Sequence, residues 1–507
     1  MSGTASVERA FCAACPLRKS LAEQVGQLQA RILELEQQLA RVEAERDEAV
    51  QQADQLRSEL GTLHRRRKRQ AAPFSKDAPT PHPKKPGRKA GASYGKKGHR
   101  PAPSKIDEVV QAELPETCPH CGGHDIEPER VAPQYQVDVP PEVVAHVRQF
   151  DVHIGSCGDC GNRVQGRHPL QTSDALGAAA SQIGPTALAL AADWKVRLGL
   201  SFELIAELFE TLWKIRVTRG ALSHALGRQS RAAAPTYEAL RDAIRQSPVV
   251  SPDESGWRVA GRSAWVWVFV TEKITFYSIE FGRGFHQAAK VLGESFSGIL
   301  VRDGWAAYRL FRNARHQTCL QHLLRRCRKN LETAQRGTAR LPRAIRRILK
   351  AAISLRDQRD LGQLATEAFA EKLAGLRQRM SHFLTWKPVD DENRKLVKHL
   401  DCERDALFTF LETPGLPATN YLAEQAIRPI IRVRKNSGGG NRTWSGAAWT
   451  AILATVLRTA RLQGLDPIAL LVRLARAPRP TVAHEIVPAL PPVGRDPPTT
   501  PPTALHG

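Results

Sequence analysis

Apolar residues recur every seven positions between residues 21 and 64, and Glu, Gln and Arg fill most of the positions between them. One apolar series is Leu21, Leu28, Leu35, Val42, Ala49, Leu56 and Leu63, and the second, four positions later, is Val25, Ile32, Leu39, Ala53 and Leu60, with Arg46 as its charged member. This heptad pattern predicts a left-handed, leucine-zipper-like coiled coil that joins two or more copies of the chain, after a tail of residues 1–20. A single amphipathic helix packed on its own domain is the alternative.

The pattern stops at a basic segment, residues 65–110, that is rich in Pro, Gly and Lys. It opens with five consecutive cations, Arg65, Arg66, Arg67, Lys68 and Arg69. The segment has too few apolar residues to offset the entropy of ordering the chain, so we expect a flexible linker. Its cations are suited to following the phosphates of DNA without reading sequence, although a solvated linker without a partner fits the same composition.

Residues 111–170 contain two CxxC pairs, Cys118/Cys121 and Cys157/Cys160, each followed by glycine. Two such turns bring four thiolates to one tetrahedral ion, so the spacing predicts a zinc ribbon with a structural Zn²⁺. The alternating residues 134–139 and 143–150 between the pairs predict a β-hairpin. Chance or redox pairing of the cysteines is the alternative.

Residues 171–246 have helical spacing of apolar residues. A helix over 202–209, a short turn and a second helix opening at Thr218 fit a helix-turn-helix in which Arg219 and Ser223 face DNA. A helical hairpin that supports the following domain fits equally well, and the sequence leaves both interpretations open.

Two aspartates follow short apolar runs in the next region, residues 247–477. Asp253 and Asp303 each come after residues typical of a buried strand, and Glu424 lies in a helical context. Carboxylates at strand ends with a third on a helix suit a cage for Mg²⁺, although solvated acids at strand ends are also common. Alternating residues at 263–270 and 274–279 predict an antiparallel strand pair.

Further helices and strands complete this region. We predict a helix over 285–292, a buried strand over 299–301, a helical insertion over about 323–411, and closing helices after 449. The whole chain is therefore expected to be a multidomain α+β protein. Beyond residue 477 the Pro-rich tail, 478–507, is expected to be disordered.

Several short segments in this region resemble the catalytic signature of the IS66-type insertion-sequence transposases, a DDE family with an RNase H-like fold. The matching segments are Asp253–Trp257, Asp303–Tyr308, Cys319–His322, Ala423–Pro429 and Arg434–Asn436, and the resemblance extends from about Leu21 to Leu471. The chain departs from the family pattern at Ser255 (usually Thr), Trp305 (usually Tyr), Gln425 (usually Arg) and Ser437–Gly440 (usually apolar). No departure removes a carboxylate.

The resemblance implies a DNA transposase that cuts at the ends of its element and joins the freed 3′-OH ends to target DNA. Asp253, Asp303 and Glu424 would hold two Mg²⁺ (or Mn²⁺) ions. Small accessory proteins encoded by the same element are implied as partners. Two other functions remain: a zinc-containing DNA-binding regulator without catalysis, and an RNase H-like nuclease without strand transfer.

Residues around the three acids have expected roles of their own. Glu254 should point to the opposite face of the strand from Asp253, and His322 and Asn420 should lie beside the site as supporting residues. Cys319 and His322 would need two further ligands to bind a metal, so a packed cysteine is the simpler interpretation. The cations expected to bind DNA beside Glu424 are Arg428, Arg432, Arg434, Lys435 and Arg442.

Charge supports a polyanionic partner. The 507 residues include 74 Lys and Arg against 51 Asp and Glu, a formal net charge of +23. Double-stranded DNA is the first candidate because phosphate neutralisation dominates such binding, and a merely basic soluble protein is the alternative. Residues 1–9 do not have the basic start and apolar core of a signal sequence, and no apolar run is long enough to span a bilayer, so we expect neither a signal peptide nor a membrane-spanning helix. We therefore expect a soluble bacterial protein, cytoplasmic and associated with the nucleoid, with no membrane partner.

Overall fold

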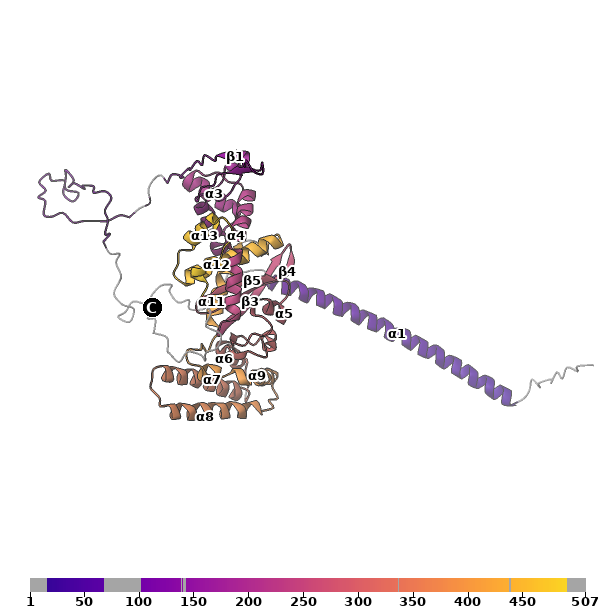
Figure 1. The fold of residues 1–507 in the computed structure, drawn as a ribbon. Helices are drawn as coiled ribbons and strands as arrows, with labels where there is room; N and C mark the ends of the chain where they lie inside the picture. Colours follow the sequence, from indigo (N-terminus) through magenta and orange to yellow (C-terminus); the bar gives the residue numbers. More distant parts are fainter. Residues whose placement is uncertain are drawn as a thin grey trace, which may run out of the picture. The chain divides into compact units, whose positions relative to one another are not determined.

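The computed structural model describes residues 16–67, 102–137, 139, 143–335, 337–436 and 439–489 (Figure 1). The chain divides into two units, one through residue 137 and one from residue 138 onward. Among the described residues, no helix combines the length and the apolar character needed to cross a membrane. The prediction of a disordered tail from residue 478 is wrong for its first part, because residues 478–489 pack on the second unit: Ala483 and Ile486 are fully buried in its core, and His484–Ile486 form a short 3-10 turn. Residues from 490 onward lie outside the described part.

The first unit contains one long helix, α1 (Pro16–Arg67). The helix covers the whole predicted heptad region and continues through Arg65–Arg67, which the sequence had assigned to the linker; Lys68 and Arg69 lie outside the described residues. All the described apolar side chains of the heptad except the half-buried Ala53 are exposed, for example Leu28 at 63% and Val42 at 60%. An exposed apolar seam is compatible with the predicted coiled coil, which stays a prediction.

The second unit begins with a small antiparallel hairpin, β1 (Ile154–Ser156) and β2 (Arg163–Gln165). The hairpin predicted for 134–139 and 143–150 is wrong, because the described residues of those stretches form no strand. Their apolar side chains have no core to face, and Val144 and Val147 are 81% and 88% exposed. The observed hairpin instead brackets the second CxxC pair, whose turn joins its strands.

Helices α2 (Pro185–Asp193), a π-helical turn η3 (Trp194–Leu198), α3 (Phe202–Trp213) and α4 (Arg219–Arg245) follow. Thr218 caps α4 by accepting a hydrogen bond from the amide of Ala221, at 3.1 Å. Helix α4 buries residues along most of its length, including Leu222 and Leu240, and packs against α12, α13 and α5. This packing favours the supporting hairpin over a free recognition helix, although Arg219 at its start is exposed.

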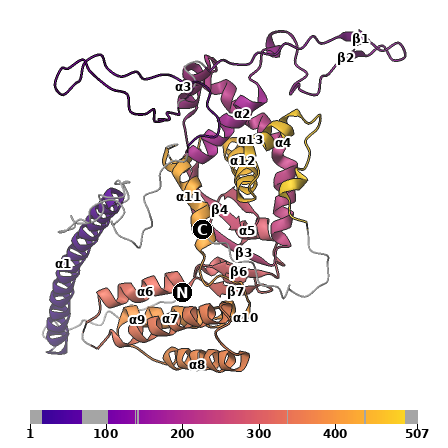
Figure 2. The same cartoon turned by 90° about the vertical axis from the view of Figure 1, so that its left-hand side faces the viewer.

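A mixed sheet forms the centre of the second unit (Figure 2). Its strands are β3 (Val249–Val259), β4 (Arg262–Val270), β5 (Thr275–Glu280), β6 (Ile299–Arg302) and β7 (Arg315–Thr318), in the order β5–β4–β3–β6–β7. The pairs β3–β4 and β4–β5 are antiparallel, whereas β6 and β7 run parallel to β3. The predicted strands at 263–270, 274–279 and 299–301 coincide with β4, β5 and β6.

Helices cover both faces of this sheet. On one face, Tyr237 of α4 stacks on Phe276 of β5 with ring centroids 4.4 Å apart, and α5 (Phe285–Leu292) contacts α4. On the other face lies α11 (Tyr421–Asn436), where the hydroxyl of Tyr277 donates to the carbonyl of Ala426 at 2.6 Å. Helix α12 (Trp444–Leu462) runs along the outer edge of β5, where the amides of Thr275 and Tyr277 donate to the hydroxyls of Thr459 and Thr455. Neighbouring residues of β5 therefore contact opposite layers. Helix α13 (Pro467–Arg476) packs on α12 and α2.

Helices fill residues 320–412, where the sequence predicted an insertion. They are α6 (Leu320–Glu332), α7 (Arg340–Asp360), α8 (Thr366–Leu384), α9 (Asp391–Cys402) and α10 (Thr409–Glu412). These helices share a hydrophobic core of their own, which includes Leu323, Leu349 and Leu396. The group lies beyond β7, at the opposite end of the sheet from β5 (Figure 2).

The end of the glycine-rich stretch after α11 is ordered by pairing with the sheet. Gly440 and Asn441 form a short strand, β8, parallel to the end of β3. A Cβ atom at Gly440 would collide with the carbonyl oxygen of Arg258, so glycine is required for this close approach. Asn441 accepts a hydrogen bond from the indole of Trp257 at 2.9 Å, which fixes the turn to β3.

Candidate functional site

Asp253 and Asp303 occupy equivalent positions relative to the pairing of the parallel strands β3 and β6. Val249 pairs with Ile299, and each aspartate comes four residues later in the chain. Asp303 directly follows β6, as predicted, but Asp253 lies inside β3 rather than at its end. The strand continues because it pairs with β4 as far as Val259, whereas its pairing with β6 stops after Val250.

Glu424 comes to the same region from the first turn of α11, which packs on β3. Burial, and after it the negative charges of Glu254, Asp303 and Glu424, together raise the pKa of Asp253 to about 7. The three predicted acids are thus close enough to repel one another. Among the described residues, no Lys, Arg or His forms an ion pair with Asp253.

Glu254 lies on the opposite face of β3, as predicted, and its carboxylate is compensated. The side chain is 1% exposed and accepts hydrogen bonds from Arg283, at 2.8 Å, and from the hydroxyl of Tyr308. Burial raises the pKa of Glu254, and these two donors oppose the rise. Neither Arg283 nor Tyr308 was predicted, although Tyr308 belongs to a segment that the sequence comparison with the family had singled out.

The loop after Asp303 contacts Arg283 through Trp305. The backbone amide of Trp305 donates to the Asp303 carboxylate at 2.9 Å, and its indole donates to the carbonyl of Arg283 at 3.1 Å. The guanidinium of Arg283 lies 3.9 Å from the centre of the Trp305 ring. The large ring at position 305 thus links the orientation of Asp303 to the Glu254 side of the strand.

A buried cluster of ion pairs holds the backbone of Asp303 in position. Arg302 is 2% exposed, and its guanidinium donates to Glu403 at 2.7 Å and to the carbonyl of Asp303 at 2.9 Å. Arg309 donates to the other oxygen of Glu403 at 2.8 Å. His316 receives a hydrogen bond from Arg302 at 3.1 Å, and burial, together with the Arg302 charge, lowers the pKa of His316 to about 4.

Only part of this cluster had a signal in the sequence. An arginine at the end of a buried apolar strand, directly before a candidate acid, marks Arg302 as needing a partner. The partner, Glu403, lies 101 residues further along the chain, where no local pattern points to it. The insertion also contacts the loop at Gly304, where a Cβ atom would collide with the ring of His399 of α9.

Asn420 links the strand of Asp253 to the helix of Glu424. Its side-chain amide donates to the carbonyl of Pro252 at 2.7 Å, and its own carbonyl accepts from the amide of Glu424 at 3.1 Å. The residue is 1% exposed. This geometry supports the expected role of Asn420 beside the acids.

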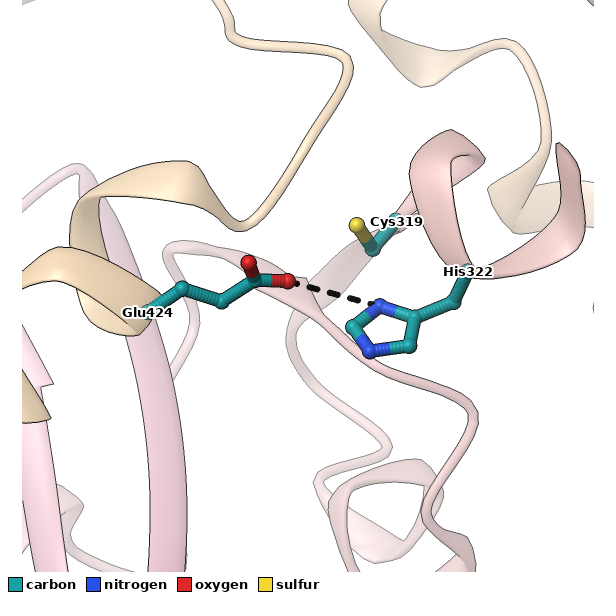
Figure 3. A group of neighbouring side chains, drawn as sticks. All are labelled: Cys319, His322 and Glu424. Carbon is teal, nitrogen blue, oxygen red and sulfur yellow. Dashed lines mark ion pairs between the residues drawn. The ribbon is translucent and has the colours of Figure 1, made fainter. Parts of the chain in front are cut away.

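Cys319, His322 and Glu424 form a compact group (Figure 3). One ligand atom from each lies within 4.8 Å of the others, and no other set of three described His, Cys, Asp or Glu residues meets this limit, so Asp253, Asp303 and Glu424 do not converge as tightly. Burial opposes ionisation of Cys319, but the His322 ring and the amides of Asn420 and His322 outweigh it and lower the pKa of the thiol. The contact with Cys319 raises the pKa of His322, against the effect of burial.

Four of the five cations expected around Glu424 are exposed: Arg428, Arg432, Lys435 and Arg442. Arg434 differs, because its guanidinium donates to the hydroxyl of Ser255 at 3.0 Å and to the carbonyl of Gly256. Burial lowers the pKa of Arg434. This side chain holds α11 against β3.

Each CxxC pair folds into the same turn. The amides of Gly122 and Gly161 donate to the carbonyls of Cys118 and Cys157 at 2.8 and 2.9 Å, and both glycines have left-handed backbone angles. Backbone amides lower the pKa of Cys118 and of Cys157, which favours the thiolate that zinc requires. Cys118 and Cys121 belong to the first unit, and Cys157 and Cys160 to the second.

Comparison with known proteins gives one family. The family model described as "Transposase IS66 family" matches residues 180–448, which is more than half of the chain and includes all three acids. No curated protein matches the sequence.

Proposed function

The chain belongs to the IS66 family of transposases, and from this premise we propose that it cuts phosphodiester bonds at the ends of its element and joins the 3′-OH ends to target DNA. Asp253, Asp303 and Glu424 are the proposed ligands of two Mg²⁺ (or Mn²⁺) ions. Bound there, the ions would activate the attacking hydroxyl and stabilise the leaving oxygen.

The observation that carries this proposal is the uncompensated charge on one face of β3. Asp253 has a pKa of about 7 because it is buried and because the negative charges of Glu254, Asp303 and Glu424 disfavour its ionisation. A divalent cation relieves that repulsion and accepts carboxylate oxygens as ligands. Asp253 gives up its proton to solvent when the cation binds, so binding should strengthen as the pH rises towards 7.

The fold supports the proposal. Three antiparallel strands followed by two parallel ones, with the first acid on the central β3 and the second after β6, agree with an RNase H-like sheet. Arg302 and Glu403 would keep Asp303 in place, and Asn420 would keep Glu424 in register with β3. The exposed cations of α11, such as Arg428 and Arg432, would bind the phosphates of the DNA.

The remaining parts of the chain would bring the DNA ends together. We assign the exposed seam of α1 to a coiled coil between two or more copies. Four thiolates, Cys118, Cys121, Cys157 and Cys160, would hold one structural Zn²⁺. The basic residues after α1 would bind DNA without sequence preference, and α3–α4 would support the sheet. Accessory proteins of the same element remain proposed partners.

The test is cleavage of a labelled duplex that carries the element's own ends, in Mg²⁺. We expect end-specific nicking by the wild type and at least a hundredfold loss in Asp303→Ala, since the ligand is removed. Glu371→Ala, an exposed acid of α8, is the matched control and should cleave normally. Equal cleavage by Asp303→Ala would refute the assignment, and end binding without cleavage by any variant would favour the regulator.

A further inference from the structure

The group formed by Cys319, His322 and Glu424 has a chemistry that the proposed Mg²⁺ site does not use. Figure 3 shows the thiol and the imidazole pointing from the start of α6 towards the carboxylate of α11. Mg²⁺ prefers oxygen ligands, whereas a thiolate and an imidazole are typical ligands of Zn²⁺. The set therefore differs in kind from the Asp253–Asp303 pair.

Hydrogen bonds between α6 and the start of α11 hold this group in place. The amide of Leu320 donates to the carbonyl of Ala418 at 3.0 Å, and the amide of Asn420 donates to the Cys319 sulfur at 3.2 Å. Cys319 precedes the first turn of α6, and His322 lies three residues later on the same side of that turn. The ligands thus come from two helices whose relative position is already fixed.

Two buried polar atoms of this region make no hydrogen bond among the described residues. They are Nδ1 of His322 and Oδ1 of Asn420. Nδ1 of His322 lies 3.8 Å from the Glu424 carboxylate, too far for a hydrogen bond. Zinc–ligand bonds of about 2.0–2.3 Å in a tetrahedral site place neighbouring ligand atoms roughly 3.3–3.8 Å apart, so a small closure would bring the group to one ion.

We propose that Cys319, His322 and Glu424 bind a thiophilic divalent cation, Zn²⁺ in the first place, with the remaining position open to water. Binding releases the thiol proton of Cys319 to solvent. The second half of this inference rests on the proposed function: an ion held here engages Glu424, so the acid is withdrawn from the Mg²⁺ cluster. Zn²⁺ should then inhibit cleavage in competition with Mg²⁺.

The binding half is tested by the zinc content of the full-length chain after dialysis against a buffered Zn²⁺ solution. The four cysteines of the proposed ribbon contribute equally in all variants. We expect Cys319→Ala and His322→Ala each to hold one equivalent less than the wild type. Cys327→Ala, a buried cysteine of α6 outside the group, is the control and should keep the full amount.

His322→Ala keeps the test decisive if Cys319→Ala fails to fold, because the His322 side chain is 40% exposed. A second measurement is the absorption spectrum of the protein loaded with Co²⁺. When the spectrum of His322→Ala is subtracted from that of the wild type, the difference should contain a thiolate–cobalt absorption band. Equal zinc content in all variants, or no such difference, would overturn the site.

The inhibition half is tested in the cleavage assay at fixed Mg²⁺. Each variant is normalised to its own rate without Zn²⁺. We expect His322→Ala to need about tenfold more Zn²⁺ than the wild type for half-inhibition, because it lacks one ligand. Identical inhibition curves would contradict the competition. Absence of cleavage in every protein would refute the proposed function, while the zinc content would still decide whether the site exists.

Discussion

The two faces of β3 treat neighbouring carboxylates in opposite ways. Glu254 is buried against Arg283 and Tyr308, which donate to its oxygens. Asp253, the residue before it, accepts one hydrogen bond, from the amide of Glu254 at 2.9 Å, and faces Asp303 and Glu424. Burial makes both carboxyl groups harder to ionise, but only Glu254 has a cationic partner, Arg283.

This difference indicates that the Glu254 face has a structural role and that the Asp253 face has the role of binding metal. A buried charge without a partner costs stability, and such costs concentrate where a protein must bind a ligand. The Glu254 face behaves as an ordinary buried ion pair that fixes the loop of Asp303. The Asp253 face keeps a negative charge that an added cation would compensate. Substitutions on the two faces should therefore have effects of opposite sign.

The largest loss of stability is expected at Glu403, a buried acid that forms ion pairs with two arginines. Glu403→Gln removes the charge opposite Arg302 and Arg309, and Arg302 is almost completely buried. We expect the free energy of unfolding in urea to fall by about 3–5 kcal/mol. Glu371→Gln on the surface of α8 should change it by less than about 0.5 kcal/mol. A fall of similar size in both would mean that the buried cluster contributes nothing particular.

Glu254→Gln should be the next most damaging. The substitution leaves Arg283 and Tyr308 facing a neutral amide, and we expect a loss of about 2–3 kcal/mol in unfolding free energy. Cleavage should also fall, because the loop of Asp303 is fastened through Arg283. An unchanged urea midpoint would show that the contacts of Glu254 do not matter for folding.

Asp253→Asn should increase the free energy of unfolding at neutral pH, by less than the two glutamate substitutions lower it. The raised pKa of Asp253 means that the folded state binds its proton more tightly than the unfolded chain does. Its stabilising effect is present below about pH 4 and is lost as the pH rises through about 7. A rise from 3.8 to about 7 corresponds to roughly 4 kcal/mol at most, and about 2 kcal/mol is a reasonable expectation for a partly exposed group.

The measurement is urea unfolding of both proteins in EDTA from pH 5 to pH 8. Asp253→Asn should gain on the wild type as the pH increases, and saturating Mg²⁺ should cancel or reverse the gain. A constant difference across this range would mean that Asp253 ionises normally in the folded protein.

The smallest effects are expected at two arginines of α11, one of which should affect DNA binding and the other stability. Arg428 is exposed, so Arg428→Ala should lower DNA affinity severalfold and reduce the salt dependence of binding by about one phosphate contact. Arg434 contacts β3, so Arg434→Ala should lower stability by about 1–2 kcal/mol. Titration of a labelled duplex at several salt concentrations, with urea unfolding of both variants, checks this. The same salt slope for Arg428→Ala and wild type would remove Arg428 from the DNA-binding surface.

The sequence predicted those features that depend on local pattern. Heptad spacing gave the extent of α1 to within a few residues, and alternation gave β4 and β5, because each periodicity reflects a single element. The position of Asp253 inside β3 was missed, since the strand is prolonged by its pairing with β4. The false hairpin at 134–150 had the alternation of a strand but no apolar layer to cover it.

The site was predictable only in its acids. The expected trio could be proposed from apolar runs and from the resemblance, but the partners of these acids are remote in sequence. Arg283 meets Glu254, Arg302 meets Glu403, and Cys319 lies beside Asn420 only after the sheet and both helices have packed. No periodicity encodes contacts of that range.

The most direct test of the account is calorimetric titration of Mg²⁺ into the full-length protein at pH 8, with wild type, Asp253→Asn and Glu254→Gln compared. We predict that the wild type binds Mg²⁺, that Asp253→Asn binds at least about tenfold more weakly, and that folded Glu254→Gln keeps most of the affinity. Equal Mg²⁺ affinity in Asp253→Asn and wild type would contradict the claim that the uncompensated face of β3 is the metal site.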